Sequence, residues 1–479
     1  MFRKVIFILI SIALFIVIFL KFSTSRKSLN VVIIHVDAAR MDHLSCYGYE
    51  RKTSPNIDTL AKEGIVFYNT IVAAPFTLPS VASLFTSQYP HSHGVRDHPD
   101  IGNCVLDNRH ITMAEILAKE GYKTAIFHEH PYFTPAFGLC QGFGTAVYDP
   151  SEITDYTKNI TSTVNKWLIA NVKNNFFIYI QFIDPHYPYS PPYPYNEMFN
   201  TVNAEEFDKK FNNPEKYGGR LFFHTKSILS DQEIYYAIAL YDGEIAYADY
   251  KVGMVLNQLK DLGLDKNTLV ILTSDHGESL GENNLYFCHD FHLKDALVKV
   301  PLIIKFPDKI SSKQINIKEQ VRNIDILPTI LDILKIKISK KWGMEGVSFL
   351  PLILGKKWNP LYAFAESCSY RGQKFCSDIS MEEQSFYIKG IKGKHRMIRT
   401  NKWKLILIPK EDKNVFELYN LEDDPKETKN LVTTEKHIFG ILKTKLIKWS
   451  NEEKYAETRG KHFLGDDIKQ RLKSLGYLE

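Results

Sequence analysis

The chain has 479 residues, of which 44% are hydrophobic and 24% are charged, so roughly two or three domains with a large apolar core are expected. The formal net charge of +5 is small for this length, and no Lys/Arg cluster with interleaved aromatic residues indicates nucleic acid as a partner. None of the six cysteines forms a Cys-x-x-Cys pair, so neither a zinc ribbon nor a thioredoxin-type motif is predicted.

The N-terminus carries an apolar run at residues 5–20 that follows two basic residues and ends at Lys21. Its length lies between a signal-peptide core and a full membrane-spanning helix. Residues 23–25 are a weak candidate for a cleavage site, but Lys21 and the length of the apolar run favour an uncleaved anchor. We therefore expect a single-pass protein of the cell membrane with an extracytoplasmic catalytic domain, or a secreted protein if the segment is cleaved.

Mostly apolar runs that are typical of buried parallel strands recur along the chain, and helical patterns separate them. The predicted strands cover residues 31–36, 123–128, 176–183, 268–273 and 300–306, and the predicted helices cover residues 54–64, 79–86, 112–121, 152–171, 231–262 and 323–334. This alternation predicts an α/β fold with a mostly parallel sheet and helices on both faces.

The sequence pattern changes near residue 360, where short predicted strands and turns lead to a charged helix near residues 433–451. We therefore predict three parts along the chain. They are an N-terminal anchor or signal segment with its linker at residues 1–28, a catalytic domain at residues 29–358, and a small α+β C-terminal subdomain at residues 359–479.

Three polar residues lie where a parallel sheet binds ligands. Asp37 and Asp275 follow predicted strands, and Thr77 precedes a predicted helix. Ligands of open parallel sheets bind beyond the carboxyl ends of the strands, so these remote segments can meet there. His276 follows Asp275, and two carboxylates, an imidazole and a hydroxyl suit Zn²⁺ or Mn²⁺ better than Ca²⁺. We predict one divalent metal ion bound by these four residues.

Thr77 is also a candidate nucleophile. The N–H groups at a helix N-terminus create a positive field that would stabilise an alkoxide and an incoming anion. A metal ion bound to the same oxygen would lower the pKa of the hydroxyl further. The alternative is that Thr77 only caps the helix.

Longer motifs resemble the sulfatase family of the alkaline phosphatase superfamily. The matching stretches are Asp37-Ala38-Ala39-Arg40, Cys46-Tyr47-Gly48, and residues 77–86, 89–95, 184–189, 241–245, 274–282, 399–405 and 417–427. The resemblance covers about residues 30–479. It implies an alkaline-phosphatase-like three-layer sandwich with a mostly parallel central sheet, and a metal-dependent hydrolase of ester bonds.

The chain departs from the pattern of formylglycine-dependent sulfatases at several positions. Those enzymes carry Cys or Ser with Arg four positions later, whereas this chain has Thr77 and Val81. A threonine cannot become formylglycine, because its β-carbon bears a methyl group. Ala38 and His276 replace an acidic residue and an asparagine of the family, which weakens a Ca²⁺ site. His128-Glu129-His130 lies near the place of the family's Gly-Lys-Trp-His stretch.

These departures resemble the threonine-dependent phosphodiesterases and phosphoethanolamine or phosphoglycerol transferases of the superfamily. The resemblance implies that Thr77 attacks phosphorus, forms a phospho-threonine intermediate and is released by water. We therefore predict a phosphoester hydrolase, more specifically a phosphodiesterase, whose partner is a small-molecule, lipid or glycan ester. The alternatives are a sulfuric ester hydrolase that works without formylglycine, a transferase of phospho-head-groups to cell-surface lipid or glycan, and a degenerate binding protein.

Further site residues follow from the same resemblance. His186 and His289 lie where the family keeps residues that bind substrate or protonate the leaving group, and both are predicted to be catalytic and substrate-binding. His289 stands where sulfatases often use Lys, so a loop histidine is its alternative. Arg40 and His130 are predicted to bind substrate, and an ion pair is the alternative for Arg40.

Overall fold

The computed structural model describes residues 29–99, 104–149, 160–200, 230–282, 285–307, 315–359, 361–368, 393–452 and 465–475. The apolar run at residues 5–20 lies outside these ranges. Within them, none of the helices combines the length and the apolar character that crossing a membrane requires. The longest of these helices, α10 (Asp231–Asp261), carries acidic and basic side chains along its whole length. The expected single-pass localisation in the cell membrane is therefore corrected, and a membrane partner has no support.

Nine strands of the described chain form one central sheet. They are β1 (Asn30–Val36), β2 (Ile65–Ile71), β3 (Lys123–His128), β4 (Thr145–Tyr148), β5 (Phe176–Phe182), β6 (Thr268–Thr273), β9 (Lys299–Lys305), β10 (Ile315–Ile317) and β11 (Val321–Arg322). Their order is β10-β2-β9-β6-β1-β5-β3-β4, with β11 beside β2. Only β9 is antiparallel to its neighbours β2 and β6, so the predicted mostly parallel sheet is confirmed.

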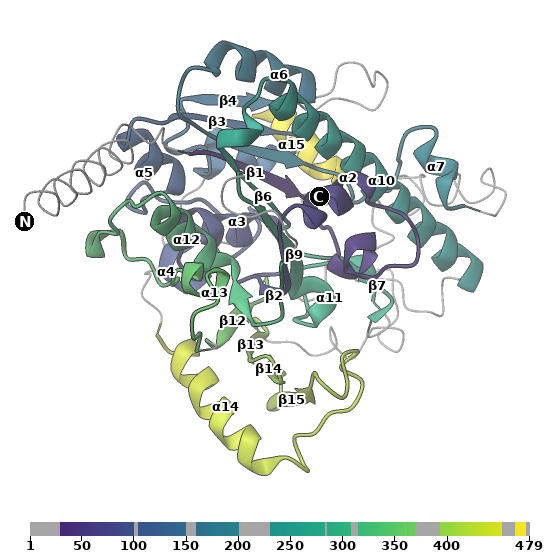
Figure 1. Cartoon of the computed structure of the whole chain (residues 1–479). Helices are drawn as coiled ribbons and strands as arrows, with labels where there is room; N and C mark the ends of the chain where they lie inside the picture. The colour runs from purple at the N-terminus through teal and green to yellow at the C-terminus, as the bar shows by residue number, and fades with distance from the viewer. Residues whose placement is uncertain are drawn as a thin grey trace, which may run out of the picture.

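Helices cover both faces of the sheet, as Figure 1 shows. One face packs on α3 (Thr77–Thr86), α5 (Met113–Lys119) and α12 (Ile326–Ile333), and the other packs on α2 (Pro55–Lys62), α6 (Ile160–Asn171) and α10. Side chains of a strand alternate between the two faces. Val31 and Ile33 of β1 therefore join the first core, whereas Val32 and Ile34 join the second. This arrangement confirms the three-layer sandwich.

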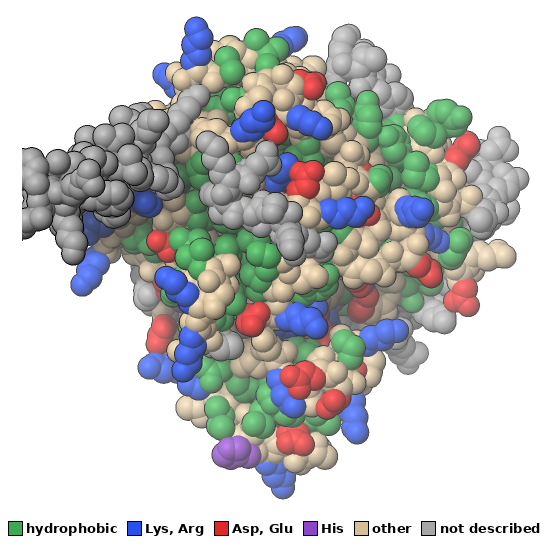
Figure 2. All heavy atoms as spheres, in the orientation of Figure 1, with side chains coloured by type: hydrophobic (Ala, Val, Ile, Leu, Met, Phe, Trp, Pro, Cys, Tyr) green, Lys and Arg blue, Asp and Glu red, His purple; other side chains and the backbone are tan. Residues whose placement is uncertain are grey.

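A second sheet lies in the C-terminal part of the chain. It is antiparallel and consists of β12 (Ala363–Glu366), β13 (Arg396–Arg399), β14 (Trp403–Pro409) and β15 (Asn414–Asn420). One face packs on the main body through a cluster that includes Val298 and Val300, and the other face packs on α14 (Lys436–Ser450). The predicted small C-terminal subdomain is thus present. Figure 2 shows side chains of both charge signs interspersed over this side of the molecule.

The chain returns to the main body after this sheet. Helix α15 (Asp466–Ser474) places Leu472 in the same core as Phe133 of the catalytic part. The domain border near residue 358 stays a prediction. Besides short 3-10 helices, the described chain also contains α4 (Pro90–His93), α7 (Tyr195–Met198), β7 (Ser279–Leu280), β8 (Tyr286–Cys288), α11 (Asp295–Val298) and α13 (Leu350–Ile353).

Candidate active site

The carboxyl ends of β1 and β6 and the N-terminus of α3 meet at one edge of the central sheet. Asp37 follows β1, Asp275 and His276 follow β6, and Thr77 is the first residue of α3. All four side chains are buried. The structure therefore brings together the four residues that the sequence predicts as a metal site.

His276 lies at the centre of this cluster. Its Nε2 atom is 3.4 Å from Oγ1 of Thr77, 3.6 Å from Oδ1 of Asp37 and 3.5 Å from Oδ2 of Asp275. Its other ring nitrogen, Nδ1, lies 2.8 Å from the carbonyl oxygen of Gly277. A carbonyl oxygen can only accept a hydrogen bond, so Nδ1 carries the proton and the lone pair of Nε2 faces the cluster.

Two carboxylate oxygens of the cluster lack a hydrogen-bond partner among the described residues. They are Oδ1 of Asp37 and Oδ2 of Asp275, and both are buried. Their companion oxygens are engaged, because Gln181 Nε2 donates to Oδ2 of Asp37 at 2.9 Å and the His276 N–H donates to Oδ1 of Asp275 at 3.0 Å. Buried carboxylates require a partner, and a divalent cation at these two oxygens would supply it.

The charges of the two aspartates influence each other. Burial raises the pKa of Asp37 well above its ordinary value, and the charge of Asp275 raises it further. Burial also acts to raise the pKa of Asp275, but the neighbouring His276 and His35 hold it below its usual range. Asp275 is therefore an anion in the folded protein, and a cation beside it would also favour the ionised form of Asp37.

His35 is a site residue that the sequence analysis missed. His35, Asp37 and Asp275 offer ligand atoms that all lie within 4.8 Å of one another. Residues two apart in a strand share a face, so the position of His35 before Asp37 could have revealed it. The same spacing occurs on the paired strand β5. Tyr179 and Gln181 lie two residues apart on this strand, and Gln181 is in register with His35.

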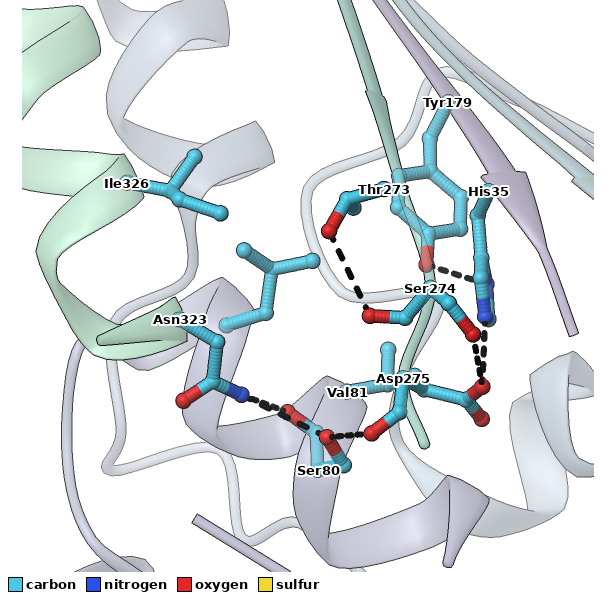
Figure 3. A pocket seen from close by; sticks show the side chains of 10 residues that line it. His35, Ser80, Val81, Tyr179, Thr273, Ser274, Asp275, Asn323 and Ile326 are labelled. Carbon is cyan, nitrogen blue, oxygen red and sulfur yellow. Dashed lines mark hydrogen bonds and ion pairs between the residues drawn. The ribbon is translucent and has the colours of Figure 1, made fainter. Parts of the chain in front are cut away.

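Behind Asp275, polar side chains hold the end of β6 against α3, as Figure 3 shows. Ser80 Oγ donates to the carbonyl oxygen of Asp275 at 2.6 Å, and Asn323 Nδ2 donates to the Ser80 carbonyl oxygen at 3.1 Å. Val81, at the position where formylglycine-dependent sulfatases carry Arg, lines the same gap. These contacts fix the backbone of Asp275 relative to Thr77.

The predicted substrate-binding histidines gather around the same edge. The ring of His289 stacks on that of His276 with centroids 4.3 Å apart, and His186 lies 5.0 Å from His289. The ring of His130 lies 5.8 Å from that of His186. These residues follow β3, β5 and β8, so three separate segments carry the histidines to one place.

The pKa values of His186 and His289 are shifted in opposite directions. Burial and the neighbouring His289 lower the pKa of His186 to about 3, so His186 is neutral. Burial also acts to lower the pKa of His289, but Asp290 and Glu278 raise it above its ordinary value. Glu278 Oε1 lies 3.3 Å from Nδ1 of His289. An unequal pair of this kind suits one acid and one base.

Arg40 is placed in an ion-pair network instead of in the histidine group. Its guanidinium donates to both carboxylate oxygens of Asp42, at 3.0 and 2.8 Å, and to Glu282 at 2.7 Å. A fourth hydrogen bond goes to the carbonyl oxygen of Glu278 at 3.0 Å. The role of Arg40 in substrate binding stays a prediction.

Comparisons with known proteins agree with this architecture. The profile of the family described as Sulfatase matches residues 29–336, and the profile described as N-sulphoglucosamine sulphohydrolase, C-terminal matches residues 281–452. An arylsulfatase of Clostridium perfringens is 27% identical over 85% of this chain and 91% of its own length. An ulvan-active sulfatase of Formosa agariphila is 28% identical over 68% of this chain, which spans 65% of that relative.

Solved structures share the fold. A phosphonate monoester hydrolase of Agrobacterium radiobacter superposes with a TM-score of 0.66 at 21% identity, over 88% of this chain and 95% of that one. A 2-O GAG sulfatase superposes with a TM-score of 0.68 at 20% identity, over 93% of this chain and 100% of that one. Both layers of helices and the C-terminal sheet thus belong to an architecture seen before.

Proposed function

Because the chain belongs to the sulfatase family, we propose that this ester hydrolase cleaves sulfuric esters with Thr77, instead of a formylglycine, as its nucleophile. One observation carries the proposal. The Thr77 hydroxyl and two buried carboxylate oxygens without partners, from Asp37 and Asp275, surround the lone pair of His276 Nε2. This set fits a single divalent cation beside a nucleophile.

The relatives support a sulfate ester as the substrate. One is named an arylsulfatase and another an ulvan-active sulfatase, so a small-molecule or glycan sulfate ester is the substrate class that we propose. The donor set of two carboxylates, one imidazole and one hydroxyl favours Zn²⁺ or Mn²⁺ over Ca²⁺. When bound, the cation would lower the pKa of the Thr77 hydroxyl and neutralise a nonbridging oxygen of the ester.

The residues of this chain would divide the chemistry in two steps. Thr77 Oγ1 forms a bond to sulfur while the bond to the leaving alcohol breaks, and the threonine proton leaves to solvent. His289, which its acidic neighbours favour in the protonated form, gives a proton to the departing oxygen. Water then attacks the sulfur of the sulfo-threonine as the bond from sulfur to Thr77 Oγ1 breaks, and the neutral His186 takes a proton from the water and passes it to Oγ1. Hydrogen sulfate leaves, and His289 takes up from solvent the proton that it gave away, so that both Thr77 and His289 are restored.

A phosphoester is the second candidate substrate, and the pair Thr77 and Val81 favours it. Without formylglycine, the covalent intermediate is an ordinary ester of threonine that water must cleave at the central atom. A phosphodiester would phosphorylate Thr77. Water can cleave the resulting phospho-threonine at phosphorus by the same steps that were described for sulfur. The phosphodiesterase prediction therefore stays open as the alternative.

A panel of esters separates the two candidates. The full chain, with Zn²⁺, Mn²⁺ or Ca²⁺, is assayed on an aryl sulfate, an aryl phosphodiester and an aryl phosphonate monoester. We expect the sulfate to be turned over fastest, Thr77→Ala to lower kcat/KM at least about 10³-fold, and Thr77→Ser to retain activity. Rapid quenching should trap a sulfo group on Thr77.

Two outcomes would count against the proposal. Faster turnover of the phosphodiester, with a phospho group trapped on Thr77, would establish the second candidate instead. Turnover of any ester that survives Thr77→Ala would exclude Thr77 as the nucleophile in both candidates.

A further inference from the structure

His35 connects a buried tyrosine to the aspartate that follows β6. Its Nδ1 atom lies 2.6 Å from Oη of Tyr179, and its Nε2 atom lies 3.0 Å from Oδ1 of Asp275. Figure 3 shows the three side chains in a row. We propose that Tyr179 and His35 form a relay that orients Asp275 for the metal ion, with His35 as a positioning residue outside the coordination sphere. The inference rests on the metal-binding role proposed for Asp275.

A direct ligand role for His35 is the competing explanation. The Nε2 atom of His35 lies in the same group of potential ligand atoms as Asp37 and Asp275. It also has no well-directed hydrogen bond among the described residues, although its contact with Asp275 is short. Which role applies depends on which ring nitrogen carries the proton, because only a nitrogen without a proton can bind a metal ion.

The buried hydroxyl of Tyr179 decides the tautomer. Tyr179 has 0% exposure, and the hydrogen bond that the described structure gives its hydroxyl is the one with Nδ1 of His35. Burial raises the pKa of Tyr179 well above its ordinary value, and the charges of Asp275 and Asp37 raise it further, so the O–H is retained. A buried O–H needs an acceptor, which makes Nδ1 the acceptor and leaves the proton of His35 on Nε2.

The relay then separates the roles of the two oxygens of Asp275. Oδ1 accepts from the backbone N–H groups of Ala38 and His276, at 3.3 and 3.0 Å, and it faces the Nε2–H of His35. Oδ2 has no hydrogen-bond partner among the described residues and lies 3.5 Å from Nε2 of His276. His35 therefore holds Oδ1 and leaves Oδ2 for the cation. Outer partners of this kind contribute about 10–100-fold to metal affinity.

Metal affinity tests the relay without reference to any substrate. The dissociation constants of the full chain for Zn²⁺ and Mn²⁺ are measured by competition with a chromophoric chelator. We expect His35→Leu to weaken binding about 10–100-fold. His35→Gln should stay within a few-fold of wild type, because its amide N–H can replace the Nε2–H. Tyr179→Phe should fall between the two, because the imidazole keeps its place but loses the bond that selects its tautomer.

Pulsed electron paramagnetic resonance provides the second readout. In the Mn²⁺-loaded wild-type protein labelled with ¹⁵N-histidine, we expect coupling to one directly bound imidazole, which His276→Gln abolishes. Coupling to two bound imidazoles would overturn the inference. Unchanged metal affinity in folded His35→Leu would overturn it as well. If the leucine variant does not fold, a loss of more than tenfold in folded His35→Gln has the same consequence.

The failure of the relay can be told apart from the failure of the proposed function. If wild-type protein binds neither ion, the proposed metal site and the proposed relay are both wrong. If wild-type protein binds metal and His35→Leu binds it equally well, only the proposed relay is wrong, and the ester chemistry proposed for Thr77 is not affected.

Discussion

Two buried acidic clusters lie near each other in the fold, and they compensate their charge in different ways. The metal-facing cluster consists of Asp37, Asp275, His276 and Thr77. The lysine cluster consists of Lys251 of α10 with Glu129, Asp184 and Glu244. In the lysine cluster, Nζ of Lys251 lies 2.8 Å from Glu129 and also contacts Asp184. In the metal-facing cluster, two carboxylate oxygens have no partner in the described chain.

The lysine cluster contains its own cation. Burial acts to lower the pKa of Lys251, but Asp184 and Glu129 raise it above its ordinary value, so the ammonium stays charged. Burial and then Asp184 raise the pKa of Glu244 well above its usual range, which favours a proton on Glu244. One ammonium and one proton thus offset two of the three carboxyl groups, and burial also raises the pKa of Glu129. The metal-facing cluster has no such internal cation, which is the physical reason to expect an external one.

The lysine cluster also supports the site. Glu129 precedes His130, and Asp184 lies two residues before His186, so Lys251 joins the loops that carry two of the gathered histidines. The Ile183 N–H donates to Glu129 at 2.9 Å, which ties the same two loops together. The lysine cluster therefore joins the loops that carry the histidines, whereas binding of a cation by the metal-facing cluster stays a proposal.

The largest expected effect comes from Asp37→Asn. The change keeps the shape of the side chain but removes a charged ligand, so metal-dependent kcat/KM should fall at least about 10⁴-fold, or about 5.4 kcal/mol. The pKa of Asp37 is raised in the folded protein, so its ionised form costs stability as the pH rises through the folded pKa. The metal-free variant should therefore melt at or above the temperature of the metal-free wild type.

The lysine cluster offers the matched control for this change. Burial also raises the pKa of Glu129, but Glu129→Gln breaks a buried ion pair with Lys251, so it should lower the melting temperature. The contrast between the clusters would be contradicted if Asp37→Asn kept its activity. It would also be contradicted if the metal-free Asp37→Asn variant had a melting temperature well below that of the metal-free wild type.

Lys251→Met tests the lysine cluster directly. Removing the ammonium leaves buried carboxylates without their cation, and we expect a loss of about 3–5 kcal/mol in the free energy of unfolding. Urea denaturation of the full chain measures it. The control is Lys260→Met, on the exposed surface of the same helix, which should change stability by less than about 0.5 kcal/mol. Equal urea midpoints for Lys251→Met and wild type would show that Lys251 does not balance this cluster.

Much of the central fold could be predicted from the sequence, because its strands are buried on both faces and read as apolar runs. The strands at residues 123–128 and 268–273 have the predicted bounds. Strand β2 was not predicted, because Tyr68 and Asn69 interrupt its apolar pattern at the point where the pairing register shifts. The predicted single-pass localisation was wrong, since none of the helices in the described part of the chain is long and apolar enough to cross a membrane.

The site could be predicted only as a set of residue types. Asp37 and Asp275 can be recognised in the sequence because they follow strands, and Thr77 can be recognised because it begins a helix. His35 was missed because a histidine within a strand has no distinguishing feature until the strand register is known. The partners of Arg40 also depend on a fold contact, since Glu282 is remote in sequence. The catalytic roles of all these residues stay predictions that the variants above address.

The smallest expected effect concerns a buried histidine outside both clusters. His395, which precedes β13, has 1% exposure. Burial, followed by the charge of Lys410, lowers its pKa to about 3. The unfolded chain has the ordinary value of about 6.5, so protonation favours unfolding. The contribution of neutral His395 to stability is complete above pH 6.5 and is lost as the pH falls below it, by about 1.4 kcal/mol for each pH unit.

His395→Asn isolates this contribution, because asparagine does not titrate. Between pH 7.5 and 5.5, its free energy of unfolding in urea should fall by about 1.4 kcal/mol less than that of wild type. His437→Asn is the control, since the side chain of His437 on α14 is exposed in the folded protein as well as in the unfolded one. Parallel pH profiles for His395→Asn and wild type would mean that His395 meets an acidic partner or water as the protein acidifies. A buried histidine would then resemble the lysine cluster, with its charge balanced from within.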